Sequence, residues 1–150
     1  MKAETTSIRI AETDEEIAGC CPVMSELRPH VGAEEFVRRV RRQQGAAGYD
    51  LIFLEEGGRA RAVAGVRISE CLAWGRFMYV DDLVTLGGER SRGHGQKIFD
   101  WLHKHAEERG CEEFHLDSGV RRFGAHRFYL RNRMEIIAHH SRLKPGPKAT

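Results

Sequence analysis

The stretch that decides the fold is "LVTLGGERSRGHGQKIFDWL", Leu83 to Leu102, in which an apolar run leads through a glycine-rich turn into an amphipathic pattern. The turn, "RSRGHG" at residues 90–95, holds two glycines and two arginines. A helix leaves its first N–H groups without intrahelical partners, and its dipole favours negative charge at that end. The sequence therefore predicts an anion site at a helix start. A turn with solvated arginines is the alternative, because two glycines alone are a weak signal.

The spacing of these glycines excludes two common phosphate-binding motifs. A P-loop needs GxxxxGK followed by Ser or Thr, and no Lys-Ser or Lys-Thr pair follows the turn. A dinucleotide-binding fingerprint needs GxGxxG in an early βαβ unit, but Gly93 and Gly95 lie late in the chain and position 98 is Ile. Neither motif accounts for the turn.

The periodicity of the apolar residues predicts the elements around this stretch. Thr13 with Glu16 is a capping-box pattern that opens the first helix, and Pro22 inside that helix predicts a kink or a break. We expect strands over residues 6–12, 49–56, 59–74, 76–86, 111–118 and 134–143, and helices over 13–30, 33–44, 93–109 and 121–133. The order β-α-α-β-β-β-α-β-α-β predicts one domain over 1–150 with helices packed on a sheet, and a frayed tail at 141–150.

The composition narrows the class of protein. Hydrophobic residues make up 41% of the chain and charged residues 31%, and no apolar run approaches the roughly 20 residues of a membrane span. The N-terminus has no signal-peptide pattern, so we expect a cytoplasmic protein. The net charge of only +2 gives no reason to expect binding to nucleic acid, and we expect no binding to membranes. The four cysteines have no zinc-like spacing and the histidines do not cluster, so we expect free thiols and no metal site.

The form R/Q-x-x-G-x-G/A of "RSRGHG", after a strand and at the start of a long helix, resembles the GCN5-related N-acetyltransferases, the GNAT superfamily. The segment "YVDDLVTLGGERSRGHGQKIFDWL" is similar to motif A of that family, and "AHRFYLRNRM" is similar to motif B. The resemblance implies an α/β fold of mixed α+β type. Its central mixed, mostly antiparallel sheet would have about six or seven strands flanked by four helices. The sequence departs from the family pattern at Arg122, where many members have asparagine.

The resemblance also implies acetyl-CoA as co-substrate. Its pyrophosphate would rest on the turn, at the matching residues Arg90, Ser91, Arg92, Gly93, His94, Gly95 and Gln96. Its pantetheine arm would pair with the backbone of the strand around Leu83, Val84 and Thr85. A backbone N–H there would polarise the thioester carbonyl.

Three side chains are candidates for proton transfer. Tyr129 matches the motif-B tyrosine, which protonates the departing thiolate in this family, although a core tyrosine on a helix is the alternative. Asp81 and Asp82 lie in an apolar strand, where carboxylates are costly unless they are paired, solvated or used. Strand alternation predicts that they face opposite sides, so that only one serves as base. A structural hydrogen bond is the alternative for either, and Asp82 is the preferred candidate.

The sequence thus predicts an acetyltransferase that moves an acetyl group from acetyl-CoA to a primary amine of a small molecule or peptide by direct attack. A homodimer is compatible with this interpretation. A non-catalytic acyl-CoA-binding sensor with the same fold is the alternative, and a nucleic-acid-binding module is a third. The identity of the acceptor amine stays open.

Overall fold

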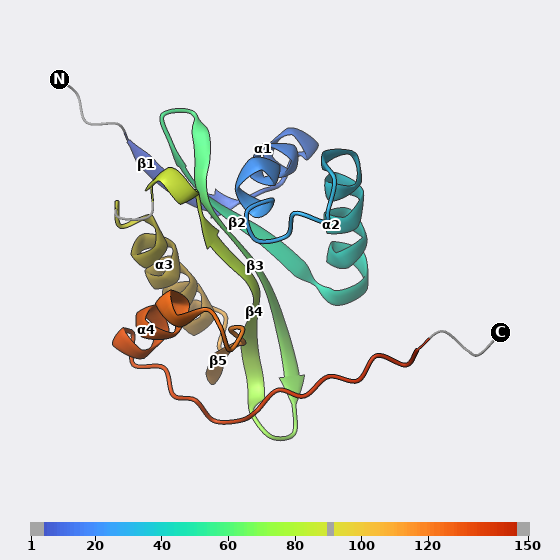
Figure 1. Ribbon diagram of the computed structural model, residues 1–150, viewed down its shortest axis with the longest axis vertical. Helices are drawn as coiled ribbons and strands as arrows, with labels where there is room; N and C mark the ends of the chain where they lie inside the picture. The colour runs from blue at the N-terminus through green and yellow to red at the C-terminus, as the bar shows by residue number, and fades with distance from the viewer. Residues whose placement is uncertain (1–4, 90–91, 147–150) are drawn as a thin grey trace. The chain divides into compact units, whose positions relative to one another are not determined.

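The computed structural model describes residues 5–89 and 92–146 (Figure 1). The chain divides into two compact units, with the boundary between Leu116 and Asp117. The first unit holds the whole sheet, and the second holds one helix, α4 (Phe123–Arg131). The expected single domain over 1–150 stays a prediction. None of the helices in the described part of the chain is both long and apolar enough to cross a membrane.

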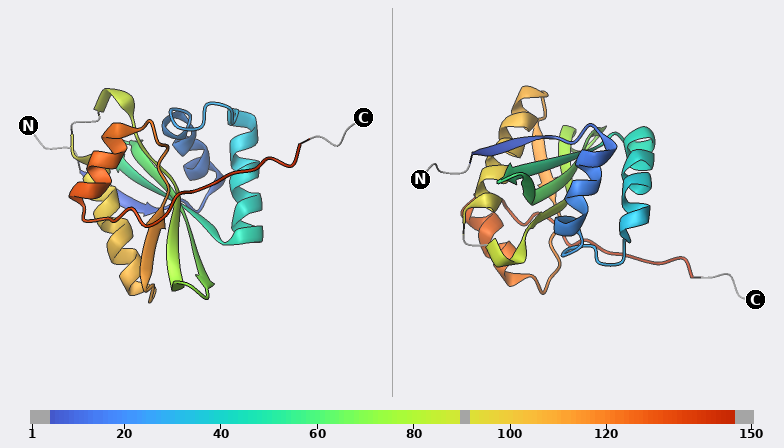
Figure 2. Two further views of the ribbon diagram at one scale, coloured as in Figure 1. Left: turned by 60° about the horizontal axis from the view of Figure 1, so that its bottom comes forward. Right: turned by 90° about the horizontal axis from the view of Figure 1, so that it is seen from above.

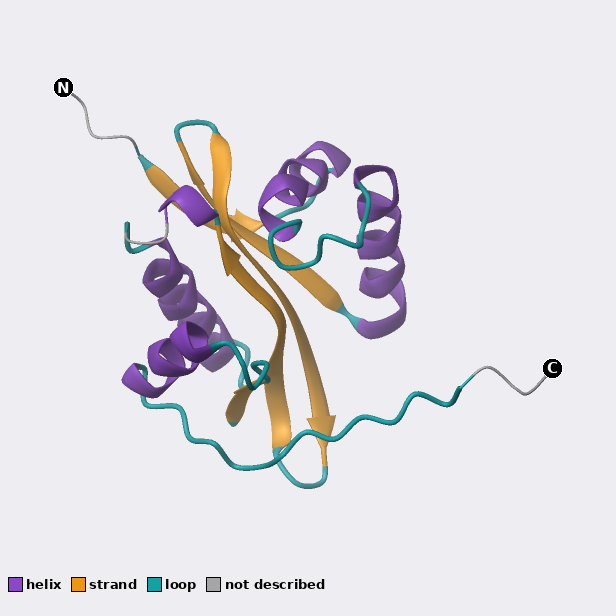
Figure 3. Cartoon of the chain, in the orientation of Figure 1, coloured by secondary structure: helices purple, strands orange, loops and turns teal. Residues whose placement is uncertain are grey.

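The first unit is a twisted five-stranded sheet with strand order β1-β2-β3-β4-β5 (Figure 3). Neighbouring strands are antiparallel except β4 and β5, which are parallel because α3 connects them. The elements in chain order are β1 (Thr6–Ile10), α1 (Asp14–Met24), α2 (Ala33–Ala47), β2 (Tyr49–Glu56), β3 (Arg59–Cys71), β4 (Gly75–Thr85), the 3-10 turn η1 (Gly87–Glu89), α3 (His94–Glu108) and β5 (Glu113–Leu116). The predicted α/β fold with a mixed, mostly antiparallel sheet is confirmed.

The number of strands is lower than predicted. The sheet has five strands instead of six or seven, and the strand expected over residues 134–143 is wrong, because this segment carries no regular structure in the described chain. Its apolar residues Ile136, Ile137 and Leu143 are exposed. A strand needs a neighbour to complete its hydrogen bonds, and none of the described strands pairs with this segment.

The sheet separates two hydrophobic clusters, with α1 and α2 on one face and α3 on the other (Figure 2). Successive residues of β2 show how the sequence achieves this: Leu51 and Phe53 pack toward α1 and α2, while Ile52 and Leu54 pack toward α3. Both faces of the strand are therefore apolar, as the run "YDLIFLEE" requires of a central strand.

The helix ends follow the local sequence signals. The capping box of α1 is present: the Thr13 hydroxyl oxygen accepts a hydrogen bond from the Glu16 N–H, and the Glu16 carboxylate accepts one from the Thr13 N–H. Pro22 does not break α1, although it removes one N–H from the last turn, and the helix ends two residues later at Met24. Gly48, with φ of 65°, caps α2 in the left-handed conformation.

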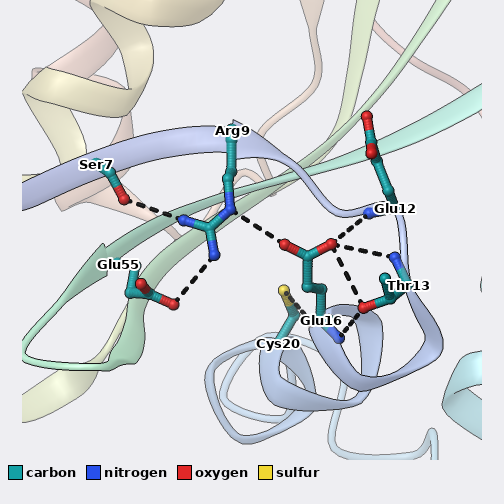
Figure 4. A network of polar contacts seen from close by, with 7 residues as sticks. All are labelled: Ser7, Arg9, Glu12, Thr13, Glu16, Cys20 and Glu55. Atoms are coloured by element: carbon teal, nitrogen blue, oxygen red, sulfur yellow. Dashed lines mark hydrogen bonds and ion pairs between the residues drawn. The ribbon is translucent and has the colours of Figure 1, made fainter.

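Glu16 also connects α1 to the edge of the sheet (Figure 4). One carboxylate oxygen accepts hydrogen bonds from the backbone N–H groups of Glu12 and Thr13, and the other accepts one from Arg9 at 3.1 Å. These donors, the two backbone groups above all, lower the pKa of Glu16 from 4.5 to about 2. The ionised Glu16 carboxylate therefore stabilises the N-terminal end of α1 and its contact with β1.

We predict that Glu16→Gln destabilises the protein at neutral pH and not at pH 2. Glutamine still accepts the capping bonds but lacks the charge. Because the folded pKa is lowered, the contribution of the charge is complete above pH 4.5 and is lost as the pH falls toward about 2. Thermal melting of both proteins across this range measures the difference. Glu15→Gln, on the same exposed first turn of α1, is the control: no described residue donates a hydrogen bond to the Glu15 side chain, so this substitution should change the melting temperature much less.

Candidate functional site

The second half of β4 has a backbone edge without a strand partner. β4 pairs with β5 only from Phe77 to Val80, whereas its pairing with β3 continues from Asp82 to Thr85. The two parallel strands therefore separate after Val80, and in the described residues the far edge of β4 beyond this point belongs to no ladder. Such an edge presents free N–H and C=O groups at strand spacing, which suits an extended ligand with amide groups of its own.

The start of α3 lies against the end of this edge. Gly93 is the N-cap of α3 and has φ of 81°, a conformation that L side chains rarely adopt. A Cβ on Gly93 would meet nothing within 4 Å, so the space above the turn is open. A Cβ on Gly95 would lie 3.4 Å from the methyl carbon of Thr85, which places the first turn of α3 beside the last residue of β4. The predicted anion site at the start of α3 therefore lies next to the unpaired edge of β4.

A buried carboxylate holds this turn in place. Glu56, the last residue of β2, accepts a hydrogen bond from Arg92 at 3.0 Å and lies 3.4 Å from Nε2 of His94. Both Glu56 and His94 are buried, at 7% and 1% exposure. The hydroxyl of Thr6 donates to Glu56 at 2.9 Å, and this bond first of all, then His94 and Arg92, lowers the pKa of Glu56 against the effect of burial. Glu56 therefore stays ionised beneath the turn.

The residues predicted to form the anion site differ in their exposure, and two of them are not described. Arg90 and Ser91 lie outside the described residues. The side chain of His94 is turned into the protein, so any contact of His94 with an anion comes from its backbone. Arg92 and Gln96 are exposed, and Gln96 donates to Asp100 at 2.9 Å. Sequence reasoning missed Glu56, for which a charged residue at the end of an apolar strand was the available signal.

Asp81 and Asp82 face the same side of the sheet, in contrast to the predicted alternation. The register of β4 against β3 shifts between Gly65 and Val66, so that β4 carries one extra residue there, Asp81. The bulge reverses the alternation: Val80 packs toward α3 before it, whereas Val84 packs toward α1 and α2 after it. Both carboxylates consequently line one pocket.

Each aspartate has its own cationic partner. Arg67 binds Asp81 through two parallel bonds of 2.7 and 2.8 Å, the bidentate geometry typical of strong arginine–carboxylate pairs. Arg28, in the segment between α1 and α2, donates from Nε to Asp82 at 2.8 Å and from Nη2 to the backbone oxygen of Asp81 at 3.0 Å. The structural alternative for both aspartates is therefore supported, and a catalytic role stays a prediction.

Tyr49 completes the environment of Asp82. Its hydroxyl donates to Oδ2 of Asp82 at 2.8 Å, and burial, followed by the nearby Asp82 charge, raises the pKa of Tyr49 well above its usual value. The phenol lies across Gly65 of β3, where a Cβ would fall 1.7 Å from the tyrosine oxygen. Gly65 is therefore required for this hydrogen bond to form.

These residues form the floor of a pocket of about 250 Å³ between the sheet and α2. Its polar lining comes from the sheet, from α2 and from the segment that connects α1 to α2. The polar residues that line it are Arg28, His30, Arg39, Gln43, Tyr49, Asp81 and Asp82. The pocket lies on β4 immediately before the unpaired edge.

Tyr129 lies on α4, in the second unit. Burial raises the pKa of its hydroxyl, and Arg122 opposes this shift. The phenol is therefore held in its protonated form, as a proton donor must be. No group of three or more potential metal ligands occurs among the residues that the structure describes.

Comparison with known proteins decides the family. A model of the acetyltransferase (GNAT) family matches residues 2–133, nearly the whole chain. The chain belongs to this family. An uncharacterized N-acetyltransferase of Bacillus subtilis strain 168, YhdJ, is 34% identical over 115 residues, which make up 77% of this chain and 81% of YhdJ. The GNAT family that the two sequence motifs indicated is thereby confirmed.

Solved structures share the GNAT fold. Glucosamine-6-phosphate N-acetyltransferase from Arabidopsis thaliana matches with a TM-score of 0.75 at 24% identity, covering 95% of this chain and all of the plant enzyme's chain (100%). An aminoglycoside N-acetyltransferase in complex with CoA matches with a TM-score of 0.77 at 13% identity, covering 95% of this chain and 98% of that chain. At these identities the likeness shows the fold alone.

Proposed function

We propose that this protein is an N-acetyltransferase that moves an acetyl group from acetyl-CoA to the primary amine of a small molecule or peptide. The observation that carries the proposal is the unpaired edge of β4, which leads directly to an open turn at the start of α3. Family membership supports the same conclusion. Acetyl-CoA, when bound, supplies an activated acetyl thioester.

The residues present fit such a co-substrate. The backbone N–H groups of His94, Gly95 and Gln96 belong to the first turn of α3, at the positive end of the helix dipole, so this turn suits a pyrophosphate. The unpaired backbone of Leu83, Val84 and Thr85 suits the amide groups of the pantetheine arm. One N–H of this edge is proposed to donate to the thioester oxygen, where negative charge develops during transfer.

Direct attack by the amine requires no acyl-enzyme. Of the four free cysteines, Cys20 and Cys21 are buried, and burial raises the pKa of Cys20 to about 12. A thiol in that state is a poor nucleophile. We propose that Tyr129 protonates the thiolate that leaves. One of the two β4 aspartates is proposed to accept the amine proton through a water, and Asp82 is preferred because acidic residues recur at its place in the family pattern.

We predict that acetyl-CoA raises the melting temperature of the protein. At about 100 times its dissociation constant a ligand stabilises a fold by about 2.7 kcal/mol, which corresponds to about 5–10 °C for a chain of this size. Gly93→Asp should abolish the shift because it puts a Cβ and a negative charge where the pyrophosphate binds. Gly110→Asp is the matched control, since Gly110 also has a positive φ and open surroundings, at the other end of α3. The absence of a shift with millimolar CoA would overturn the assignment.

Tyr129→Phe keeps the ring and removes the proton. We expect turnover to fall by about 10- to 10⁴-fold, the scale of a general acid, while the CoA-induced melting shift stays near that of the wild type. Tyr79→Phe removes the same group from a tyrosine of β4 that stacks with Arg67, and it should keep its turnover. Thiol release from acetyl-CoA measures both variants. Equal turnover in Tyr129→Phe and the wild type would make Tyr129 a core residue only.

Substituting each aspartate with asparagine distinguishes the roles of Asp81 and Asp82. If Asp82 is the base, Asp82→Asn loses turnover and the acidic limb of its rate-versus-pH profile. Asp81→Asn should then lower the melting temperature more than the rate, because it breaks the bidentate pair with Arg67. Melting curves and pH–rate profiles of both variants test this. If neither changes the rate at any pH, deprotonation falls to water or to another group.

A further inference from the structure

The pocket next to the unpaired edge holds more hydrogen-bond donors than its own acceptors use. Arg28 bonds through Nε and Nη2, and no described residue accepts from its Nη1. Arg39 of α2 bonds only through Nε, to Glu35 at 3.3 Å, which leaves both of its Nη groups open among the described residues. The side chains of Arg28 and Arg39 are 42% and 40% exposed, so these groups are accessible.

The carboxylates of the pocket do not use up this donor capacity. Both oxygens of Asp81 are held by Arg67, and those of Asp82 are held by Arg28 and Tyr49. Each carboxylate oxygen retains a second acceptor position, which an ammonium group can fill. The pocket therefore offers open guanidinium donors for an anion and open carboxylate positions for an amine.

The remaining walls and the size of the pocket restrict the occupant further. A volume of about 250 Å³ is below the range of pockets for drug-sized ligands, so the part of the acceptor that the pocket encloses is small. The apolar part of the lining comes from α1, α2 and their connection, namely Met24, Val31, Phe36 and Val40. A small molecule with an amine, an anionic group and an apolar side chain is complementary to this lining.

We propose that the acceptor is a free α-amino acid with an apolar side chain, or a close analogue. Its carboxylate binds the open groups of Arg39 and Arg28, and its amine lies by Asp82 next to the unpaired edge of β4. This inference rests on the proposed acetyl transfer and assigns its acceptor class. Arg39 acts as a specificity residue, because planar guanidinium donors match a carboxylate in bidentate geometry.

Three probes that differ only at the anionic group test the assignment. They are L-leucine, L-leucinamide and 3-methylbutylamine, which is leucine without its carboxylate. We expect kcat/KM from thiol release to favour leucine by about 10- to 100-fold, the scale of hydrogen bonds to charged groups. Leucinamide has the less basic amine, so a preference for leucine cannot come from amine reactivity. Equal use of leucinamide or 3-methylbutylamine would overturn the proposal.

Arg39→Gln should lower kcat/KM for leucine by about 10-fold or more and leave that for leucinamide within about twofold. Arg38→Gln is the matched control: Arg38 is the neighbouring residue of α2 and also pairs with Glu35, but it does not line the pocket. It should change neither value. Equal losses for leucine in the two variants would show a general effect of charge on α2 and would refute the specificity role of Arg39.

Melting in the presence of saturating CoA, which carries no acetyl group, separates this inference from the proposed reaction. We expect leucine, and not leucinamide, to raise the melting temperature of the CoA-bound wild type, and we expect Arg39→Gln to lose this effect. If leucine binds in this way but no amine is acetylated, the proposed reaction is refuted and the acceptor pocket stands. If CoA stabilises the protein and leucine adds nothing, the amino-acid pocket is refuted.

Discussion

The bulge in β4 at Asp81 is the constraint on which the rest of the site depends. One extra residue shifts the register of β4 against β3 and reverses which side chains face α1 and α2. Without it, Asp81 and Asp82 would point to opposite faces, as regular alternation requires. With it, both carboxylates reach the pocket, and the strand continues beyond its last contact with β5. The bulge thus places the polar pocket directly before the unpaired backbone edge.

Glycine at position 65 makes this arrangement sterically possible. The phenol of Tyr49 crosses β3 at Gly65 to reach Asp82, and no other residue leaves room for it. Arg28 approaches the same carboxylate from the connection between α1 and α2. Nearby, Glu26 of that connection accepts hydrogen bonds from the backbone N–H of Gly87, at the beginning of the turn that leads to α3. One short segment therefore contacts both the pocket and the end of β4.

Local signals in the sequence predicted local structure well. The capping box at Thr13 and Glu16 and the glycine start of α3 at Gly93 each follow from a few neighbouring residues. The bulge was not predictable, because "VDDLV" reads as a regular strand and only its register against β3 reveals the extra residue. The partners of Asp82 were also missed, because they are distant in sequence: Arg28 is 54 residues away. The strand expected at 134–143 failed because alternation alone does not supply a pairing partner.

The unpaired edge of β4 also bears on the solubility of the protein. Free N–H and C=O groups in strand conformation are a template for any other extended chain, including a second molecule of the same protein. The edge runs only from Asp82 to Thr85 and begins beside two charged carboxylates, both of which discourage a long ladder between molecules. An edge of this kind is open to self-association as long as nothing covers it. Occupation of the edge would protect the protein from aggregation.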